Sequence, residues 1–258
     1  MTTTASLAAS IPDGSLLALG GFMLGRAPLA IVRELVLQGK RDLHLISLPN
    51  PFPAELLVAG GCVARVDLAF SALTLAGRVR MMPSLKRAIE TGSIAWAEHD
   101  GFRVVQRLRA ASMGLPFLPA PDIDANMLAS QEPPVYVTDP FTGAEVPVER
   151  AVYPDVAILH AQAVDDAGNL YIEDPTTDIL MAGAAKRVLA TAEKRVARLD
   201  RVTIPGFQVE AVAVHEGGAL PSGCAGHYPH DEAALLAYLA LAEAGRAREW
   251  LGIGVEAA

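Results

Sequence analysis

The chain is poor in cysteine and in aromatic residues, with two cysteines and 5% aromatics in 258 residues. Cys62 and Cys224 stand alone, without a CxxC motif or a Cys/His cluster, so the sequence predicts no metal site. One disulfide is possible by count, although isolated cysteines in a chain of this size more often stay reduced in the cytosol. The scarcity of aromatics predicts a core of small and branched aliphatic side chains.

Basic residues are also in deficit, because the formal net charge is -8. Nucleic-acid binding depends on Lys and Arg that neutralise phosphates, so we expect no nucleic-acid partner. The sequence has no run of about 18 apolar residues, and its first ten residues lack the basic start and apolar core of a signal peptide. We therefore expect a cytoplasmic protein without a membrane span.

What the chain has in abundance is aliphatic residues in short runs that glycine and proline interrupt. It is 52% hydrophobic, and its length suits one large α/β domain. A buried strand over 15–19, a glycine loop, a helix opened by Pro28 and a second strand over 42–48 form a βαβ unit. Further strands are expected over 66–70, 94–97, 156–160, 170–172, 187–192 and 209–214, and further helices over 55–58, 83–92, 102–113, 177–185 and 231–244.

One stretch departs from this pattern. Residues 119–154 are rich in proline and in short polar pieces, and they predict an antiparallel hairpin over 136–148 with Thr142-Gly143 in its turn. We expect a single domain over 1–258 with this hairpin as an excursion.

The paired glycines Gly20 and Gly21 form the strongest local signal. After a buried strand, such a pair allows a sharp turn whose main-chain N–H groups can bind an oxyanion or a phosphate. The competing interpretation is a plain turn from strand to helix. The GxGxxG dinucleotide fingerprint is absent, and no Walker lysine follows the loop.

The whole string DGSLLALGGFMLGRAP, residues 13–28, resembles the signature of family I CoA-transferases. Asp13, Gly14, Gly20, Gly21, Phe22 and Pro28 stand where that signature expects them. Arg26 replaces the usual glycine two residues before the proline, a departure that favours the glutaconate CoA-transferase branch. Four later segments are also similar to that branch, at residues 55–67, 107–119, 154–173 and 217–232.

The resemblance implies a three-layer α/β/α subunit with an open, mainly parallel sheet, the CoA-transferase (NagB/RpiA-like) fold. It also implies a homologous β subunit, an acyl-CoA substrate with coenzyme A as part of it, and no tightly bound cofactor. In such transferases a glutamate attacks the thioester, giving an anhydride and then an enzyme–CoA thioester. That glutamate lies in the β subunit of two-subunit members, and its Ser-Glu-Asn-Gly motif is not found here.

Glu98 is the acidic residue of this chain that we expect to be catalytic. It lies in IAWAEHDGF, where Trp96 and other apolar groups could raise its pKa and make it a general acid or base. The same branch includes hydrolases that open a ring of a steroid-derived CoA thioester, and there a glutamate near this position would be catalytic. The alternative is a surface or helix-capping carboxylate.

Several other residues are candidates for substrate binding. His160 follows a buried strand and could reach a pocket at the carboxyl end of the sheet. Arg26 and Arg109 could bind a substrate carboxylate, or form ion pairs. A glycine-rich loop holds Ser222, Cys224, His227 and Tyr228, in which a Cys-His nucleophile pair lacks an evident orienting carboxylate. The predicted substrate-binding or oxyanion residues are Gly20, Gly21, Phe22, Arg26, Ser71, His160 and Ser222.

Three functions therefore stay open. The first is the α subunit of a CoA-transferase, the second a CoA-thioester hydrolase that uses Glu98, and the third a non-catalytic scaffold for the β subunit. The sequence does not reveal the acyl group, nor whether the assembly is αβ or α2β2.

Overall fold

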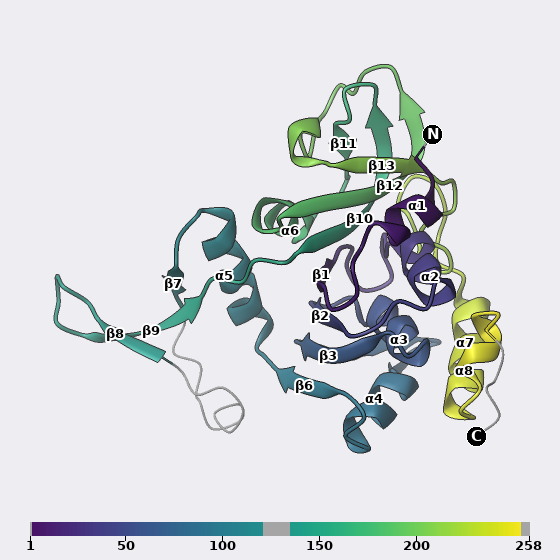
Figure 1. Ribbon diagram of the computed structural model, residues 1–258, viewed down its shortest axis with the longest axis horizontal. Helices are drawn as coiled ribbons and strands as arrows, with labels where there is room; N and C mark the ends of the chain where they lie inside the picture. Colours follow the sequence, from purple (N-terminus) through teal and green to yellow (C-terminus); the bar gives the residue numbers. More distant parts are fainter. Residues whose placement is uncertain (1, 121–134, 254–258) are drawn as a thin grey trace.

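The computed structural model describes residues 2–120 and 135–253, and Figure 1 shows their arrangement. The helices are α1 (Thr4–Ala9), α2 (Leu29–Leu37), α3 (Pro51–Ala59), α4 (Pro83–Glu90), α5 (Gly101–Ser112), α6 (Asp178–Ala184), the 3₁₀ turn η1 (Gly206–Gln208), α7 (Glu232–Glu243) and α8 (Ala247–Trp250). The strands of the main sheet are β1 (Leu16–Leu19), β2 (Leu43–Ser47), β3 (Val63–Leu68), β6 (Ala95–Glu98), β10 (Val156–Asp165), β11 (Leu170–Tyr171), β12 (Arg187–Val196) and β13 (Ala211–Val214).

The main sheet has the order β13-β12-β10-β1-β2-β3-β6, and all neighbours along this path run parallel. Short β11 pairs antiparallel with β10. Parallel strands that are buried on both faces read as continuous apolar runs, which is why SLLAL and DLHLISL were recognisable as strands.

Alternate residues of the strands pack into two separate hydrophobic cores, one on each face of the sheet. Leu17 and Leu19 of β1 pack with α2, α3 and α7 on one face, whereas Ala18 packs with α5 and α6 on the other. Figure 1 shows the two groups of helices on opposite sides of the sheet. The predicted three-layer α/β/α architecture is confirmed, and the cores consist mainly of Leu, Ile, Val and Ala, as the scarcity of aromatics indicated.

The chain leaves β1 in two directions. From β1 it adds β2, β3 and β6 on one side, and later β10, β12 and β13 on the other. The boundary between β1 and β10 is the point at which the strand order reverses, and in open α/β sheets ligands bind outside the carboxyl ends of the strands at such a point. The two halves of the carboxyl edge meet there.

Two small antiparallel sheets lie outside the main sheet. A hairpin of β4 (Ala72–Leu75) and β5 (Arg78–Met81) follows β3. The second sheet has the order β7 (Phe117–Pro119), β9 (Glu145–Arg150) and β8 (Val135–Thr138), and the β8–β9 hairpin projects from the body in Figure 1. This is the hairpin expected over 136–148; the rest of the predicted excursion lies partly outside the described residues, and the single-domain interpretation stays a prediction.

Within residues 2–120 and 135–253, no helix has the length and apolar character needed to cross a lipid bilayer.

Candidate active site

Most of the predicted site residues lie at or near the carboxyl edge of the sheet, where they fall into two groups. Gly20, Gly21, Arg26, His160 and Ser222 gather in the buried half of this edge, beside β1, β10 and β12. Ser71 and Glu98 follow or end β3 and β6 in the other half, where side chains are more exposed. Arg109 lies far along α5, near its last turn.

The glycine pair serves close packing. The Gly20 N–H donates to the Ile158 carbonyl at 2.9 Å, and the Gly21 N–H donates to Asp178 Oδ1 at 3.0 Å. A Cβ on Gly20 would lie 2.5 Å from Asp178 Oδ1, and Gly21 has φ +86. Both residues must therefore be glycine, yet both amides already have partners within the chain. In the chain alone neither amide is directed at an open site, and an oxyanion role for the glycine pair stays a prediction.

Arg26 forms a buried ion pair with Asp178. Their closest atoms, Nη2 and Oδ2, are 3.1 Å apart, and the side chains are 5% and 0% exposed. The guanidinium also donates to the carbonyls of Asp174 and His160. Burial raises the pKa of Asp178, while Arg26 and the Gly21 N–H oppose this by favouring the carboxylate. In the chain alone Arg26 therefore forms the ion pair that was the alternative interpretation, and substrate binding by Arg26 stays a prediction.

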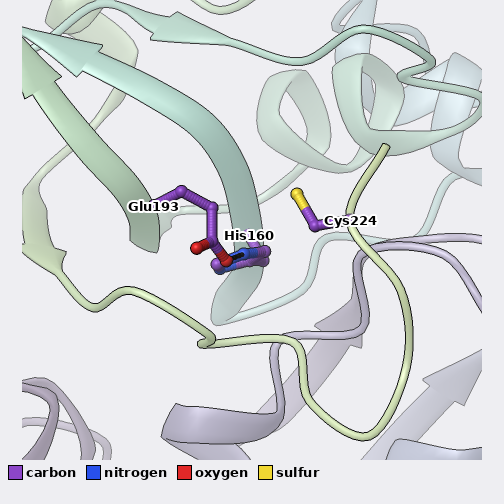
Figure 2. A group of neighbouring side chains, drawn as sticks. All are labelled: His160, Glu193 and Cys224. Atoms are coloured by element: carbon purple, nitrogen blue, oxygen red, sulfur yellow. Dashed lines mark hydrogen bonds and ion pairs between the residues drawn. The ribbon is translucent and has the colours of Figure 1, made fainter. Parts of the chain in front are cut away.

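His160 belongs to a second buried network, shown in Figure 2 with Glu193 and Cys224. Its Nε2 lies 2.7 Å from Glu193 Oε1, and its Nδ1 lies 2.8 Å from the Thr191 hydroxyl. Glu193 also accepts hydrogen bonds from the Tyr228 hydroxyl and from the Gly217 N–H. This network connects β10 and β12 with the loop over 217–228.

The protonation states of this network follow from its hydrogen bonds. Although burial disfavours the charged carboxylate, the donors His160, Tyr228 and Gly217 lower the pKa of Glu193 to about 2. Burial lowers the pKa of His160, so the ring is neutral near pH 7. Because an ionised carboxylate only accepts, Nε2 carries the ring proton and Nδ1 accepts from the Thr191 hydroxyl.

Cys224 completes the group in Figure 2 without becoming a nucleophile. One ligand atom each of His160, Glu193 and Cys224 lies within 4.8 Å of the others, a donor set that metals use. However, both His160 nitrogens and both Glu193 oxygens already have hydrogen-bond partners. Burial raises the pKa of the Cys224 thiol to about 12, so it stays protonated and unreactive near neutrality. The absence of a resident metal stays a prediction.

Ser222 is a structural link. Its hydroxyl donates to the Ala219 carbonyl at 2.6 Å and accepts from the Ala27 N–H at 3.2 Å. The neighbouring backbone adds a pairing between Gly25 and Gly223. The late glycine-rich loop is thereby fixed against the segment that leads into α2.

The other half of the carboxyl edge presents side chains to solvent. Glu98 ends the edge strand β6 opposite Leu68 and is exposed, so this chain alone does not supply the apolar enclosure that was expected around it. Ser71 is half-buried at the start of the β4–β5 hairpin. Three aromatic side chains near these strand ends are at least a third exposed, namely Phe70, Trp96 and Phe102, and Phe22 in the loop after β1 is exposed as well.

Sequence reasoning missed three residues that organise the site. Asp178 and Glu193 are the buried carboxylates on which the two networks centre. Asn50, after β2, donates from Nδ2 to the Gly20 carbonyl, while its buried Oδ1 has no hydrogen-bond partner in the described part of the chain. An available signal was the acidic residue inside the apolar run VLATAEKRV, because a carboxylate in a buried strand requires donors around it.

Comparison with known protein families gives a consistent result. A family model described as coenzyme A transferase matches residues 1–215. The chain is 30% identical over 234 residues to one subunit of the 3-oxoadipate CoA-transferase of Pseudomonas knackmussii, covering 86% of this chain and 80% of that protein. It is 29% identical over 245 residues to the cholesterol ring-cleaving hydrolase IpdA subunit of Mycobacterium tuberculosis, covering 87% and 82%.

A further relative, an uncharacterised protein of Archaeoglobus fulgidus, is 32% identical over 240 residues, or 90% of this chain, and the chain spans only 53% of its length. Among solved structures, a chain from a variant of the decarboxylase AibA/AibB is 66% identical, with a TM-score of 0.95 and coverage of 97% of this chain and 96% of that one. Glutaconate coenzyme A-transferase of Acidaminococcus fermentans is 27% identical, with a TM-score of 0.89 and coverage of 96% and 86%.

Proposed function

The chain belongs to the coenzyme A transferase family and is a homologue of its α subunits, and on this premise we propose that it is the α subunit of an enzyme that decarboxylates an acyl-CoA thioester. The prediction of an enzyme subunit of the CoA-transferase type is confirmed at the level of the family. The reaction, the acyl substrate and the identity of the partner subunit belong to the proposal.

One observation carries the choice of decarboxylation. The chain shares 66% of its residues with a chain of a decarboxylase over nearly its whole length, against 27% with glutaconate coenzyme A-transferase. The same scaffold therefore accompanies more than one reaction, which is usual because chemistry resides in particular side chains. The larger identity supports the same reaction in this chain.

The chemistry fits a family that handles CoA thioesters. In decarboxylation the bond to the carboxylate carbon breaks, CO₂ leaves, and the electron pair stays on the acyl chain until a proton adds to carbon. A thioester carbonyl conjugated with that carbon can accept the electron pair, so the step needs no oxidant. We therefore expect an acyl-CoA whose acyl group ends in a second carboxylate.

The exposed half of the carboxyl edge supplies suitable surroundings. Phe70 and Phe102 present apolar surface there, and a carboxylate transferred from water to such surface loses hydration that CO₂ does not need. We place Glu98 as the group that returns a proton to carbon, with the partner subunit covering this half of the edge. His160, Arg26 and Ser222 hold the neighbouring backbone in place.

CoA transfer is the second candidate. The names of the transferase relatives favour it, and the resemblance would assign the nucleophilic glutamate to the β subunit. Ring-opening hydrolysis is the third, through the relative that is named as a cholesterol ring-cleaving hydrolase subunit. An αβ or α2β2 assembly, a cytoplasmic location and the absence of a tightly bound cofactor stay predictions.

The test is coexpression with the partner encoded by the adjacent gene, followed by incubation of the complex with CoA thioesters of dicarboxylic acids. Mass spectrometry of the products separates the candidates. Loss of CO₂ with the thioester intact supports the proposal. CoA recovered on added acetate, together with a CoA adduct on a glutamate of the partner, would replace it with transfer, and an acyl product that has gained water would replace it with hydrolysis.

Glu98→Gln tests the assignment of the catalytic group. We expect kcat of the complex to fall about 100-fold, the scale of general acid catalysis, while assembly is unchanged. Glu90→Gln is the matched control, since Glu90 is an exposed carboxylate of α4 whose ion pair with Lys86 spans 3.8 Å. Full turnover by the Glu98 variant would remove Glu98 from the mechanism and favour the scaffold interpretation for this chain.

A further inference from the structure

A polar cavity lies on the opposite edge of the sheet from the candidate active site. Its volume is about 260 Å³, and it is lined by Val58, Ala59, Ser84, Arg87, Ala88, Thr91, Ser93, Gly245, Ala247 and Arg248. The lining comes from the last turn of α3, from α4 and the residues after it, and from the start of α8. Because β3 and β6 begin shortly after α3 and α4 end, the cavity lies at the amino ends of these strands, away from Gly20 and Glu98.

The charge of this cavity is unusual for an acidic chain. Its lining contains two guanidinium groups, those of Arg87 and Arg248, and no carboxylate. No ion pair to either arginine is present among the described residues. The chain as a whole carries a formal net charge of -8, so carboxylates for pairing are abundant elsewhere. A cavity whose own lining carries two cations and no carboxylate favours an anion from outside.

The two arginines differ in what holds them. Arg87 donates from Nη2 to the carbonyls of Ala242 and Glu243 at 3.2 and 3.3 Å, which is the usual role of a cation at a helix C-terminus. Arg248 has a buried Nε without a hydrogen-bond partner in the described part of the chain. Capping of the C-terminus of α7 therefore explains the position of Arg87. No contact within the described part of the chain explains the buried Nε of Arg248.

Hydroxyl groups complete the lining. Ser84, Thr91 and Ser93 line the same cavity as the arginines, and hydroxyls together with guanidinium forks are the groups that bind phosphate oxygens. Thr91 and Ser93 use their protons on backbone carbonyls of α4, so rotation of these hydroxyls would have to accompany binding. Tetrahedral phosphate suits two guanidinium groups that approach from different helices better than a planar carboxylate does.

We propose that this cavity between α3, α4 and α8 binds a phosphate dianion, either free phosphate or a terminal phosphate monoester, through Arg248 and Arg87. The site is separate from the edge of the sheet to which the acyl-CoA reaction is assigned, so it does not depend on which reaction the enzyme catalyses. Its volume admits a phosphate with a small attached group and excludes burial of a whole coenzyme A.

The experiment titrates inorganic phosphate into the full-length chain at constant ionic strength, with sodium chloride as compensation. We expect the midpoint of thermal unfolding to rise by about 3 °C at phosphate well above its Kd. Arg248→Gln should weaken phosphate binding at least tenfold, as measured by ³¹P line broadening. Arg246→Gln is the matched control, because Arg246 is exposed and pairs with Glu249 at 2.6 Å.

Two further measurements distinguish free phosphate from a phosphate monoester as the ligand and check that the variants are folded. Protection by coenzyme A that 3′-dephospho-CoA does not give, and that Arg248→Gln abolishes, would assign the site to the 3′-phosphate, whereas protection by inorganic phosphate alone would assign it to free phosphate. Arg248→Lys should retain partial binding, which shows that the variant site is folded. Equal phosphate binding by Arg248→Gln and Arg246→Gln, or no binding by the parent chain, would overturn the proposal.

Discussion

The two halves of the carboxyl edge differ in whether their polar residues are buried or exposed to solvent. Beside β10 and β12, the carboxylates of Asp178 and Glu193 are buried and receive donors from Arg26, His160 and Tyr228. Beside β3 and β6, Glu98 and the aromatic side chain of Phe102 face solvent. We call these the sealed half and the open half.

The difference teaches where to look for chemistry. A buried charge is tolerated only when hydrogen bonds and opposite charge compensate it, and in the sealed half Arg26 and Glu193 both have such partners within the chain. The open half has apolar surface and a carboxylate that another molecule can cover. In a two-subunit enzyme, the open half is where the second subunit would complete the site.

The largest effect is expected from breaking the ion pair of the sealed half. Asp178→Ala leaves the buried Arg26 guanidinium without its carboxylate and removes the acceptor of the Gly21 N–H. We expect the free energy of unfolding to fall by about 3–5 kcal/mol, measured by urea denaturation. Glu90→Ala, which breaks the exposed pair with Lys86, should cost less than about 0.5 kcal/mol. Equal losses of stability in the two variants would mean that the Arg26–Asp178 pair is not buried in solution.

Replacing a glycine by alanine in each half compares how tightly the two halves are packed. In Gly20→Ala the new Cβ would meet Asp178 Oδ1 at 2.5 Å and Leu159 Cδ2 at 2.6 Å, so we expect a loss of about 3 kcal/mol from over-packing. In Gly101→Ala, at the start of α5, the nearest atom would be Ala69 Cβ at 3.7 Å. That change should be neutral or should stabilise by up to about 1 kcal/mol. Thermal unfolding of both variants tests the contrast.

The pH dependence of stability reports the Glu193 network. Its pKa is lowered from 4.5 to about 2 in the folded chain, so its contribution is present above pH 4.5 and is lost as the pH falls toward 2. Between pH 5.5 and pH 3 the parent chain should lose about 2 kcal/mol that Glu193→Gln does not lose. Urea denaturation at several pH values measures both slopes, and parallel slopes would show that Glu193 is not held ionised by its donors.

Much of the fold was predictable because local signals agree with the tertiary structure. Apolar runs marked the buried parallel strands, and Pro28 and Gly39 bounded α2, where Gly39 has φ +65. The β4–β5 hairpin was missed because its turn consists of Ala76 and Gly77, both at positive φ, and alanine rarely signals such a turn. Helix α3 begins at Pro51, four residues before its predicted start, since proline is tolerated in a first turn.

The site was less predictable, because its partners are distant in sequence. The resemblance brought Gly20, Arg26 and His160 into one region, but not the carboxylates that bind them: Asp178 is 157 residues from Gly21, and Glu193 is 33 residues from His160. Local sequence shows that a glycine pair allows close approach, and only the tertiary structure shows that Asp178 is what approaches. For this reason the sequence did not predict Asp178 as the common partner of Gly21 and Arg26.

The smallest effect on the chain alone is expected in the open half. Phe102 is 49% exposed in the first turn of α5, so Phe102→Ala should change the free energy of unfolding of the isolated chain by less than about 0.5 kcal/mol. If the partner subunit covers this half, the same substitution removes buried apolar area from the interface and should weaken assembly at least tenfold, measured by sedimentation or light scattering. Phe207→Ala is the matched control. Phe207 is 89% exposed and lies in η1, just before β13, the edge strand opposite β6. Were both variants to assemble like the parent, the open half would not be the interface, and Glu98 would have to work in contact with water.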